Sequence, residues 1–153
     1  MLVDFWATWC PPCQAPMAHN QKMLDEHGSK WGGKVRLMGL SIDNEIPKVK
    51  AHVEAKGWTS PEHYHVKGEG CIAQKMFGIS GVPHVLIVDT EGIIVYKGHP
   101  ASRPSLENDF DNLLAGKPLE GMPPIVKGGE SAGSAAPVAL EGTDDETANA
   151  AIE

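Results

Sequence analysis

The chain has 153 residues, of which 41% are hydrophobic and 22% charged, and its formal net charge is −7 at pH 7. This composition supports one folded domain, and the lack of a basic stripe argues against a nucleic-acid partner. No apolar run approaches the roughly 20 residues that cross a bilayer, and no signal-peptide pattern follows Met1. We therefore expect no membrane span and a cytoplasmic location.

Two strands and an intervening helix are expected at the start of the chain. Residues 2–7 (LVDFWA) and 35–42 (VRLMGLSI) are apolar runs of strand length. The helix between them should begin at a cysteine motif and end at Gly28. We expect it to bend at Pro16, because a proline inside a helix removes a backbone hydrogen bond.

A second helix and a loop are expected next. Asp43 or the asparagine after it can cap this helix, and Gly57 is a stop signal. Residues 58–69 are predicted to form a loop, with His63 and His65 facing solvent. Two histidines alone are too few for a metal site.

The second half of the chain predicts a short helix over 71–77, a β-hairpin and a final helix. The hairpin is indicated by two apolar runs, 85–88 and 93–96, around a four-residue turn that contains glycine. The final helix carries an apolar stripe over 106–114, with Ser102 as its expected cap.

The element order β-α-β-α-α-β-β-α favours an α/β domain with a parallel core and an antiparallel edge. We expect this domain to cover residues 1–118. An irregular, acidic, low-complexity tail is expected over 119–153. Residues 127–153 contain six acidic side chains and a single basic one.

Cys10 and Cys13 form the most informative motif. They follow a predicted buried strand and open a predicted helix, where unpaired N–H groups and the helix dipole favour a thiolate. Cysteines at i and i+3 can close a disulfide, so the first sulfur can attack a substrate disulfide and the second can release the product. Pro11 and Pro12 stiffen the turn between them and remove two N–H donors.

Metal binding is the main alternative for this cysteine pair. A zinc site would need two more ligands at suitable spacing, and the third cysteine, Cys71, has no such partner. We interpret Cys71 as a half-buried residue at a helix start, with a redox role left open. No metal site and no bound cofactor are expected.

The stretch from Leu2 to Cys13 (LVDFWATWCPPC) resembles the active-site stretch of thioredoxins. The Pro-Pro dipeptide and residues 78–83 (GISGVP) resemble the TlpA/ResA-like and nucleoredoxin/tryparedoxin branches of that superfamily. The resemblance covers about residues 1–116. It implies a thioredoxin fold, with a central sheet flanked by helices and the cysteines at the carboxyl end of the first strand.

The resemblance also implies roles for other residues. Asp4 matches the buried acid behind the cysteines, which can accept the proton of Cys13 when that thiol attacks. Trp9 matches the aromatic wall beside the nucleophile. Pro83 matches the proline whose preceding peptide bond is cis, and with Val82 it would offer backbone atoms to a bound substrate.

The sequence departs from the family at its beginning, because the chain starts inside the active-site strand. A minimal four-stranded mixed sheet of order 2-1-3-4 is therefore expected. Residues 35–42 would then form a free edge strand, which could dock an assembly partner together with the tail.

Two functional hypotheses remain at this point. The first is a thiol–disulfide oxidoreductase acting on disulfide-bearing proteins and served by an upstream reductant. The alternative is a thioredoxin-like subunit of a large assembly, such as a ciliary one, with a retained or vestigial redox pair. The location would then be a cilium. If the chain is a fragment, an extracytoplasmic compartment is the other alternative.

Overall fold

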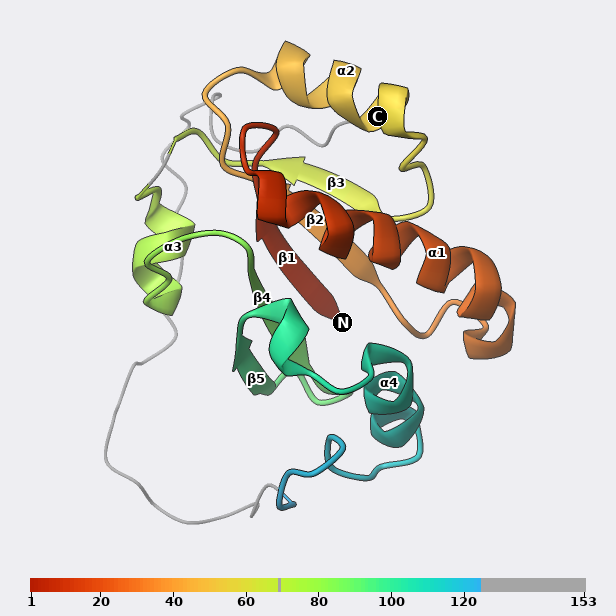
Figure 1. The fold of residues 1–153 in the computed structure, drawn as a ribbon. Helices are drawn as coiled ribbons and strands as arrows, with labels where there is room; N and C mark the ends of the chain where they lie inside the picture. The colour runs from red at the N-terminus through yellow and green to blue at the C-terminus, as the bar shows by residue number, and fades with distance from the viewer. Residues whose placement is uncertain (69, 125–153) are drawn as a thin grey trace, which may run out of the picture.

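The computed structural model describes residues 1–68 and 70–124, and its centre is a five-stranded sheet of order β3-β2-β1-β4-β5 (Figure 1). β1, β2 and β3 run parallel, whereas β4 is antiparallel to β1 and to β5. This is a mixed sheet of the thioredoxin type, as the sequence predicted. The strands are β1 (Leu2–Trp6), β2 (Leu37–Ser41), β3 (Glu62–His65), β4 (His84–Val88) and β5 (Ile94–Gly98).

The expected count of four strands is wrong, because residues 62–65 form a strand and not a loop. β3 pairs in parallel with β2, so β2 is an inner strand and the predicted free edge at 35–42 does not exist. The predicted order 2-1-3-4 is found as β2-β1-β4-β5, with β3 added beside β2. The argument for an assembly partner at this strand is thereby removed.

Both histidines of β3 are buried, contrary to the expectation that they face solvent. His63 and His65 are each 7% exposed, and each ring donates from Nε2 to a backbone carbonyl. They alternate with the half-buried Glu62 and Tyr64, which is the period-two pattern of a strand. The pattern was hidden because the buried positions are imidazoles and not aliphatic side chains.

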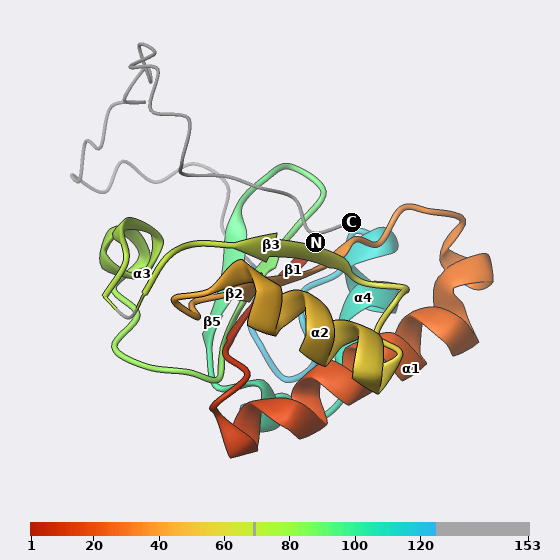
Figure 2. The same cartoon turned by 90° about the horizontal axis from the view of Figure 1, so that it is seen from above.

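Four α-helices and two short 3-10 helices surround the sheet. Asn20 of α1 and His52 of α2 contact side chains on one face, and α4 packs there through Phe110. α3 lies on the opposite side of the sheet, at the left in Figure 1, and α2 lies beside α1 in Figure 2. The helices are η1 (Pro11–Cys13), α1 (Gln14–Trp31), α2 (Ile46–Lys56), α3 (Ile72–Phe77), η2 (Pro100–Ser102) and α4 (Leu106–Leu114).

Several helix ends differ from the sequence-based expectations. α1 continues through Gly28 and ends at Gly32, whose φ of 57° suits the left-handed conformation that terminates helices. Pro16 is the third residue of α1, in the first turn, where N–H groups have no partner within the helix. It therefore gives no reason for a bend. The cap of α4 is Ser105 and not Ser102.

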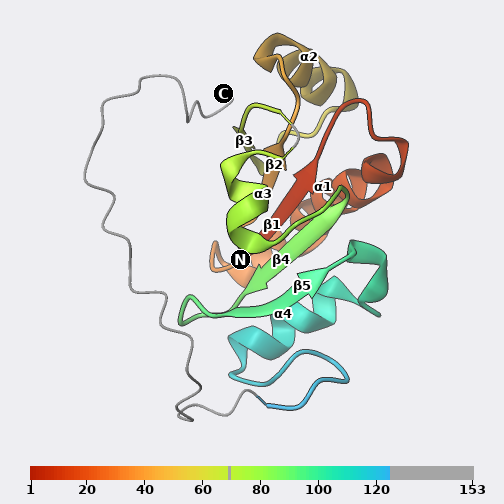
Figure 3. The ribbon, with the colours of Figure 1, turned by 90° about the vertical axis from the view of Figure 1, so that its left-hand side faces the viewer.

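The second helix also starts differently, since its N-cap is Glu45, which makes no side-chain capping bond. The β4–β5 hairpin, the short α3 with Cys71 at its N-cap, and the ends of α2 and α3 at Gly57 and Gly78 agree with the predictions. Figure 3 shows this hairpin with α4 packed beneath it.

The core consists of two clusters of buried side chains. One lies around the cysteine pair and contains Phe5, Trp6, Met17 and Trp58. The other lies at the far end of α1, where Trp31 meets Phe110 of α4, and it includes Leu119. Leu119 belongs to the stretch predicted as tail. Residues 125–153 lie outside the described part, so the boundary between domain and tail stays a prediction.

Within the described ranges, no helix combines the length and hydropathy needed to cross a membrane.

Candidate active site

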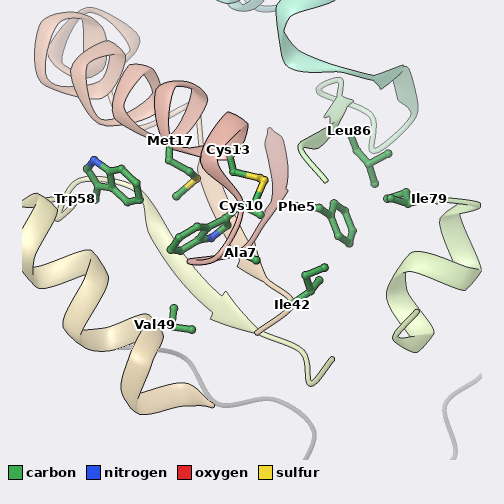
Figure 4. Packing of buried hydrophobic residues seen from close by; sticks show 11 residues of the cluster. Phe5, Ala7, Cys10, Cys13, Met17, Ile42, Val49, Trp58, Ile79 and Leu86 are labelled. Carbon is green, nitrogen blue, oxygen red and sulfur yellow. A yellow bond between two sulfur atoms is a disulfide. The ribbon is translucent and has the colours of Figure 1, made fainter. Parts of the chain in front are cut away.

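Cys10 and Cys13 form a disulfide at the junction between β1 and the first helical turns (Figure 4). Their Cα atoms are 5.4 Å apart, because η1 turns the chain back within three residues. Pro11 and Pro12 start this turn, where the missing N–H groups cost nothing. The disulfide rests on the first core cluster, next to Phe5, Ala7 and Met17 in Figure 4.

The two sulfurs differ in their access to solvent. Cys13 is fully buried, whereas Cys10 retains 4% of its surface and is preceded by Trp9, which is 53% exposed. Pro11 and Pro12 are also exposed. The surface route to the disulfide therefore leads to Cys10, and the indole of Trp9 lies at its rim.

The backbone around Cys10 has few free donors. Two prolines follow it, and the Cys13 N–H donates to the Cys10 carbonyl at 3.1 Å. Direct hydrogen bonds from these three residues are thus not available to a Cys10 thiolate. The helix dipole, which acts without such a bond, is the remaining local source of stabilisation.

Gln14 fixes the carbonyl side of the same turn. Its amide donates to the Cys10 carbonyl at 3.1 Å, and its Oε1 lies 2.6 Å from Nε2 of His52 on α2. Burial lowers the pKa of His52, so its neutral ring donates to Gln14 at neutral pH. The turn is therefore anchored to both helices of this face.

Asp43 holds the segment that leads into the cysteines. Its carboxylate accepts from the Thr8 N–H at 2.9 Å, from the Thr8 hydroxyl at 2.6 Å and from Ser41 at 2.7 Å. His65 in turn contacts the Asp43 carbonyl at 2.7 Å. The sequence suggested Asp43 only as a helix cap, although its place directly after an apolar strand was a signal for a residue at the sheet's functional edge.

Asp4 is buried in the middle of β1, at 1% exposure. Its Oδ2 accepts from the amide of Asn20 at 2.8 Å, and its Oδ1 has no hydrogen-bond partner among the described residues. Burial raises the pKa of Asp4 to about 7, and the Asn20 hydrogen bond opposes this only in part. The carboxyl group can therefore take up or give a proton near neutral pH.

The helix connects Asp4 to the cysteine pair. Cys13, Met17 and Asn20 are the buried residues spaced by four and three positions on one face of η1 and α1. The Asn20 amide donates a hydrogen bond to Asp4, and Met17 packs in the same cluster as Cys13. The sequence did not single out Asn20, although an amide on the buried face of a helix is an unusual polar residue that needs a partner.

The peptide bond between Val82 and Pro83 is cis, as the resemblance implied. Pro83 is buried, Val82 is half-buried, and Val82 packs against the cluster that contains both cysteines. His84, the next residue, faces the side of the sheet opposite to Asp4, because successive residues of a strand alternate.

No group of three or more His, Cys, Asp or Glu side chains within residues 1–68 and 70–124 is arranged to hold a metal ion. Cys71 is the free cysteine of the chain and is half-buried at the start of α3. Its structural environment agrees with the interpretation from the sequence.

Comparisons with known proteins identify similar proteins that are named for thiol–disulfide chemistry. A family model described as thioredoxin-like matches residues 1–94. The chain is 32% identical over 97 residues to the thiol:disulfide interchange protein DsbE of Haemophilus influenzae, covering 63% of this chain and 49% of that protein. It is 27% identical over 94 residues to the thiol-disulfide oxidoreductase ResA of Oceanobacillus iheyensis, covering 61% and 46%.

Solved structures show the same fold. StoA of Bacillus subtilis matches with a TM-score of 0.52 and 23% identity, covering 64% of this chain and 71% of that one. Since the chain spans about half the length of the curated relatives it matches, these likenesses concern the domain around the cysteines.

Proposed function

Because the chain belongs to the thioredoxin-like family, we propose that it is a thiol–disulfide oxidoreductase that reduces disulfides in protein substrates. The observation that carries this proposal is the Cys10–Cys13 disulfide, which lies at the start of η1, with Cys13 fully buried and Cys10 retaining 4% of its surface. The names of the relatives, thiol:disulfide interchange protein and thiol-disulfide oxidoreductase, support the same reaction class.

The reaction starts from the reduced pair. The Cys10 thiolate attacks one sulfur of the substrate disulfide, which forms a mixed disulfide and releases the other substrate sulfur as a thiolate. Cys10 suits this step because it is the sulfur with surface access. The exposed residues Trp9, Pro11 and Pro12, together with the half-buried Val82 and the buried Pro83, form the proposed substrate-binding surface.

The second step resolves the mixed disulfide. The Cys13 thiol gives its proton to Asp4, and its sulfur attacks Cys10, so that the substrate leaves with both sulfurs reduced and the Cys10–Cys13 disulfide is restored. Asp4 suits the role because burial raises its pKa to about 7 and because Oδ1 is unpartnered. The two electrons gained by the substrate come from the dithiol, and a dithiol reductant must supply them again.

A turnover assay with a protein disulfide, such as that of insulin, and a dithiol electron donor tests this proposal. Wild-type protein should accelerate the reduction, and Cys10→Ser should abolish the acceleration. Cys71→Ser is the matched control, and its rate should equal that of the wild type. A folded wild-type protein without activity, or a Cys10→Ser variant that retains it, would contradict the proposal.

We also infer a cytoplasmic setting, in which dithiol reductants keep the pair reduced between turnovers. Rapid alkylation of thiols in intact cells should then find Cys10 and Cys13 mostly reduced. Finding the pair mostly as a disulfide would oppose this location.

A further inference from the structure

Three buried polar atoms on the α1 face of the sheet have no hydrogen-bond partner among the described residues. They are Oδ1 of Asp4, Nε1 of Trp6 and Nδ1 of His63. The exposed fractions of these residues are 1%, 0% and 7%, so bulk solvent does not satisfy them. Leaving buried polar atoms unpaired is unfavourable, which calls for a common explanation.

The sheet register groups these residues around Gly39. Asp4 on β1 and His63 on β3 are both register partners of Gly39 on the strand between them. The three residues thus form one row across three parallel strands and face the same side. Trp6 is two positions from Asp4 on β1 and shares that side. Glycine provides no side chain between the carboxyl and the imidazole.

Distances around Gly39 show how close two of these atoms lie. A Cβ atom on Gly39 would be 3.1 Å from Trp6 Nε1 and 3.3 Å from His63 Nδ1. It would also be 2.7 Å from the terminal methyl of Met17, which covers this space from α1. Gly39 is therefore flanked by two polar atoms, and the flexible end of Met17 must shift to admit a further atom between them.

The hydrogen-bonding roles of the three atoms are complementary. His63 Nε2 lies 2.6 Å from the Trp58 carbonyl and must donate to it, so Nδ1 of the neutral ring is an acceptor. Burial lowers the pKa of His63, which keeps this ring neutral at neutral pH. The indole Nε1 of Trp6 can only donate, and the ionised carboxylate of Asp4 can only accept.

We propose that the space above Gly39 is a binding site for one water molecule, which accepts from Trp6 and donates to His63 and to Asp4. One donor and two acceptors are the partners that a single buried water satisfies. By donating to Oδ1, this water stabilises the ionised form of Asp4. His63 is then a positioning residue that orients the water toward the carboxylate.

The other polar groups on this face have partners of their own. On α1 the residue that faces Asp4 is the neutral Asn20, already bonded to Oδ2. His52 of α2 contacts the ring of Trp6 but uses Nε2 for Gln14. Asp43 and His65 are bonded to each other and lie at the end of the strands. None of these interactions reaches the three unpartnered atoms.

Two substitutions remove the water in different ways. His63→Gln keeps a donor for the Trp58 carbonyl but loses the Nδ1 acceptor, because the amide of glutamine replaces Nε2. Gly39→Ala places a methyl group in the space, and only the flexible end of Met17 must move by more than a few tenths of an ångström. If one variant does not fold, the other still tests the proposal.

The matched control is His65→Gln, since His65 lies on the same strand and face, is equally buried and also contacts a backbone carbonyl through Nε2. The readout is the pKa of Asp4, measured by NMR from its side-chain carbon in the reduced protein. We expect it to rise by about half a unit or more in His63→Gln and in Gly39→Ala, and to stay unchanged in His65→Gln.

A high-resolution crystal structure of the wild type should show the water within hydrogen-bond distance of all three atoms. An unchanged Asp4 pKa in both variants, an equal rise in the control, or a direct Trp6–His63 hydrogen bond in place of the water would overturn the proposal. Asp4 belongs to the site of the proposed function, but its titration is measured without substrate. A protein that is inactive as a reductase can therefore still pass or fail this test.

Discussion

Asp4 and Asp109 are both buried carboxylates on the side of the sheet covered by α1 and α4, and their surroundings differ. Asp109 is fully buried and accepts two hydrogen bonds of 2.7 Å from Arg103 and one of 3.0 Å from the Glu120 N–H. Asp4 is equally buried but has one bond, from the neutral Asn20, and its second oxygen has no partner among the described residues. One carboxylate is saturated with donors and the other is not.

This difference separates a structural role from a chemical one. The Arg103 pair ties α4 to the segment around residue 120, which closes the second core cluster. Asp4 makes no comparable tie, and burial leaves its pKa at about 7. A group that has to exchange a proton near neutral pH cannot be held permanently in its charged form, so incomplete pairing suits Asp4.

The largest effect on stability is expected from breaking the saturated pair. Arg103→Met should lower the free energy of unfolding by about 3–5 kcal/mol, because it leaves the Asp109 charge buried without its partner. Urea unfolding measures this, and disulfide reduction by the folded variant should be unaffected. Arg36→Met is the control: its ion pair with Glu62 is exposed, so the loss should be far smaller. Equal losses in the two variants would contradict the distinction.

The opposite sign is expected for Asp4→Asn. The folded pKa of about 7 lies above the ordinary aspartate value of 3.8, so the wild type loses stability as pH rises between these values. Above the folded pKa the variant should be more stable than the wild type by roughly 2–4 kcal/mol. Below the unfolded pKa the difference should nearly vanish. Unfolding curves across this pH range test both expected differences in stability. A stability gain in the variant that is independent of pH would argue against a raised pKa of Asp4.

A smaller loss is expected for Thr8→Val, which removes the hydroxyl that donates to Asp43 but keeps the backbone donor. Like Asp109, the Asp43 carboxylate is well supplied with donors, since it accepts three hydrogen bonds. The expected loss is about 1–2 kcal/mol in the free energy of unfolding. Thr90→Val, at an exposed turn position, is the matched control and should change little. A neutral Thr8→Val would show that the hydroxyl bond to Asp43 is not needed to hold the segment before Cys10.

Aliphatic patterns explain how much of the fold was predictable. The runs at 2–7, 35–42 and 85–88 form the three inner strands. Their burial follows from their hydrophobic side chains. β3 was missed because its buried residues are histidines, which become acceptable in the core only through the Trp58 and Asp43 carbonyls. These bonds join residues five and 22 positions apart, so no local pattern reveals them.

The site was predictable where chemistry depends on spacing, and less so where it depends on tertiary contacts. Two cysteines at i and i+3 after an apolar strand were sufficient to locate the disulfide. Asn20, Gln14 and Asp43 were missed as supports, because their partners come from other strands and helices. Ser105 rather than Ser102 caps α4, since Ser102 belongs to η2.

The most direct test of the central claim is a single-turnover measurement of mixed-disulfide resolution against pH, comparing the wild type with Asp4→Asn. We predict a component of the wild-type rate that rises with a midpoint near 7, the pKa of Asp4. In the variant this component should disappear and resolution should slow by on the order of 100-fold. Identical profiles in the two proteins would show that Asp4 does not accept the proton of Cys13.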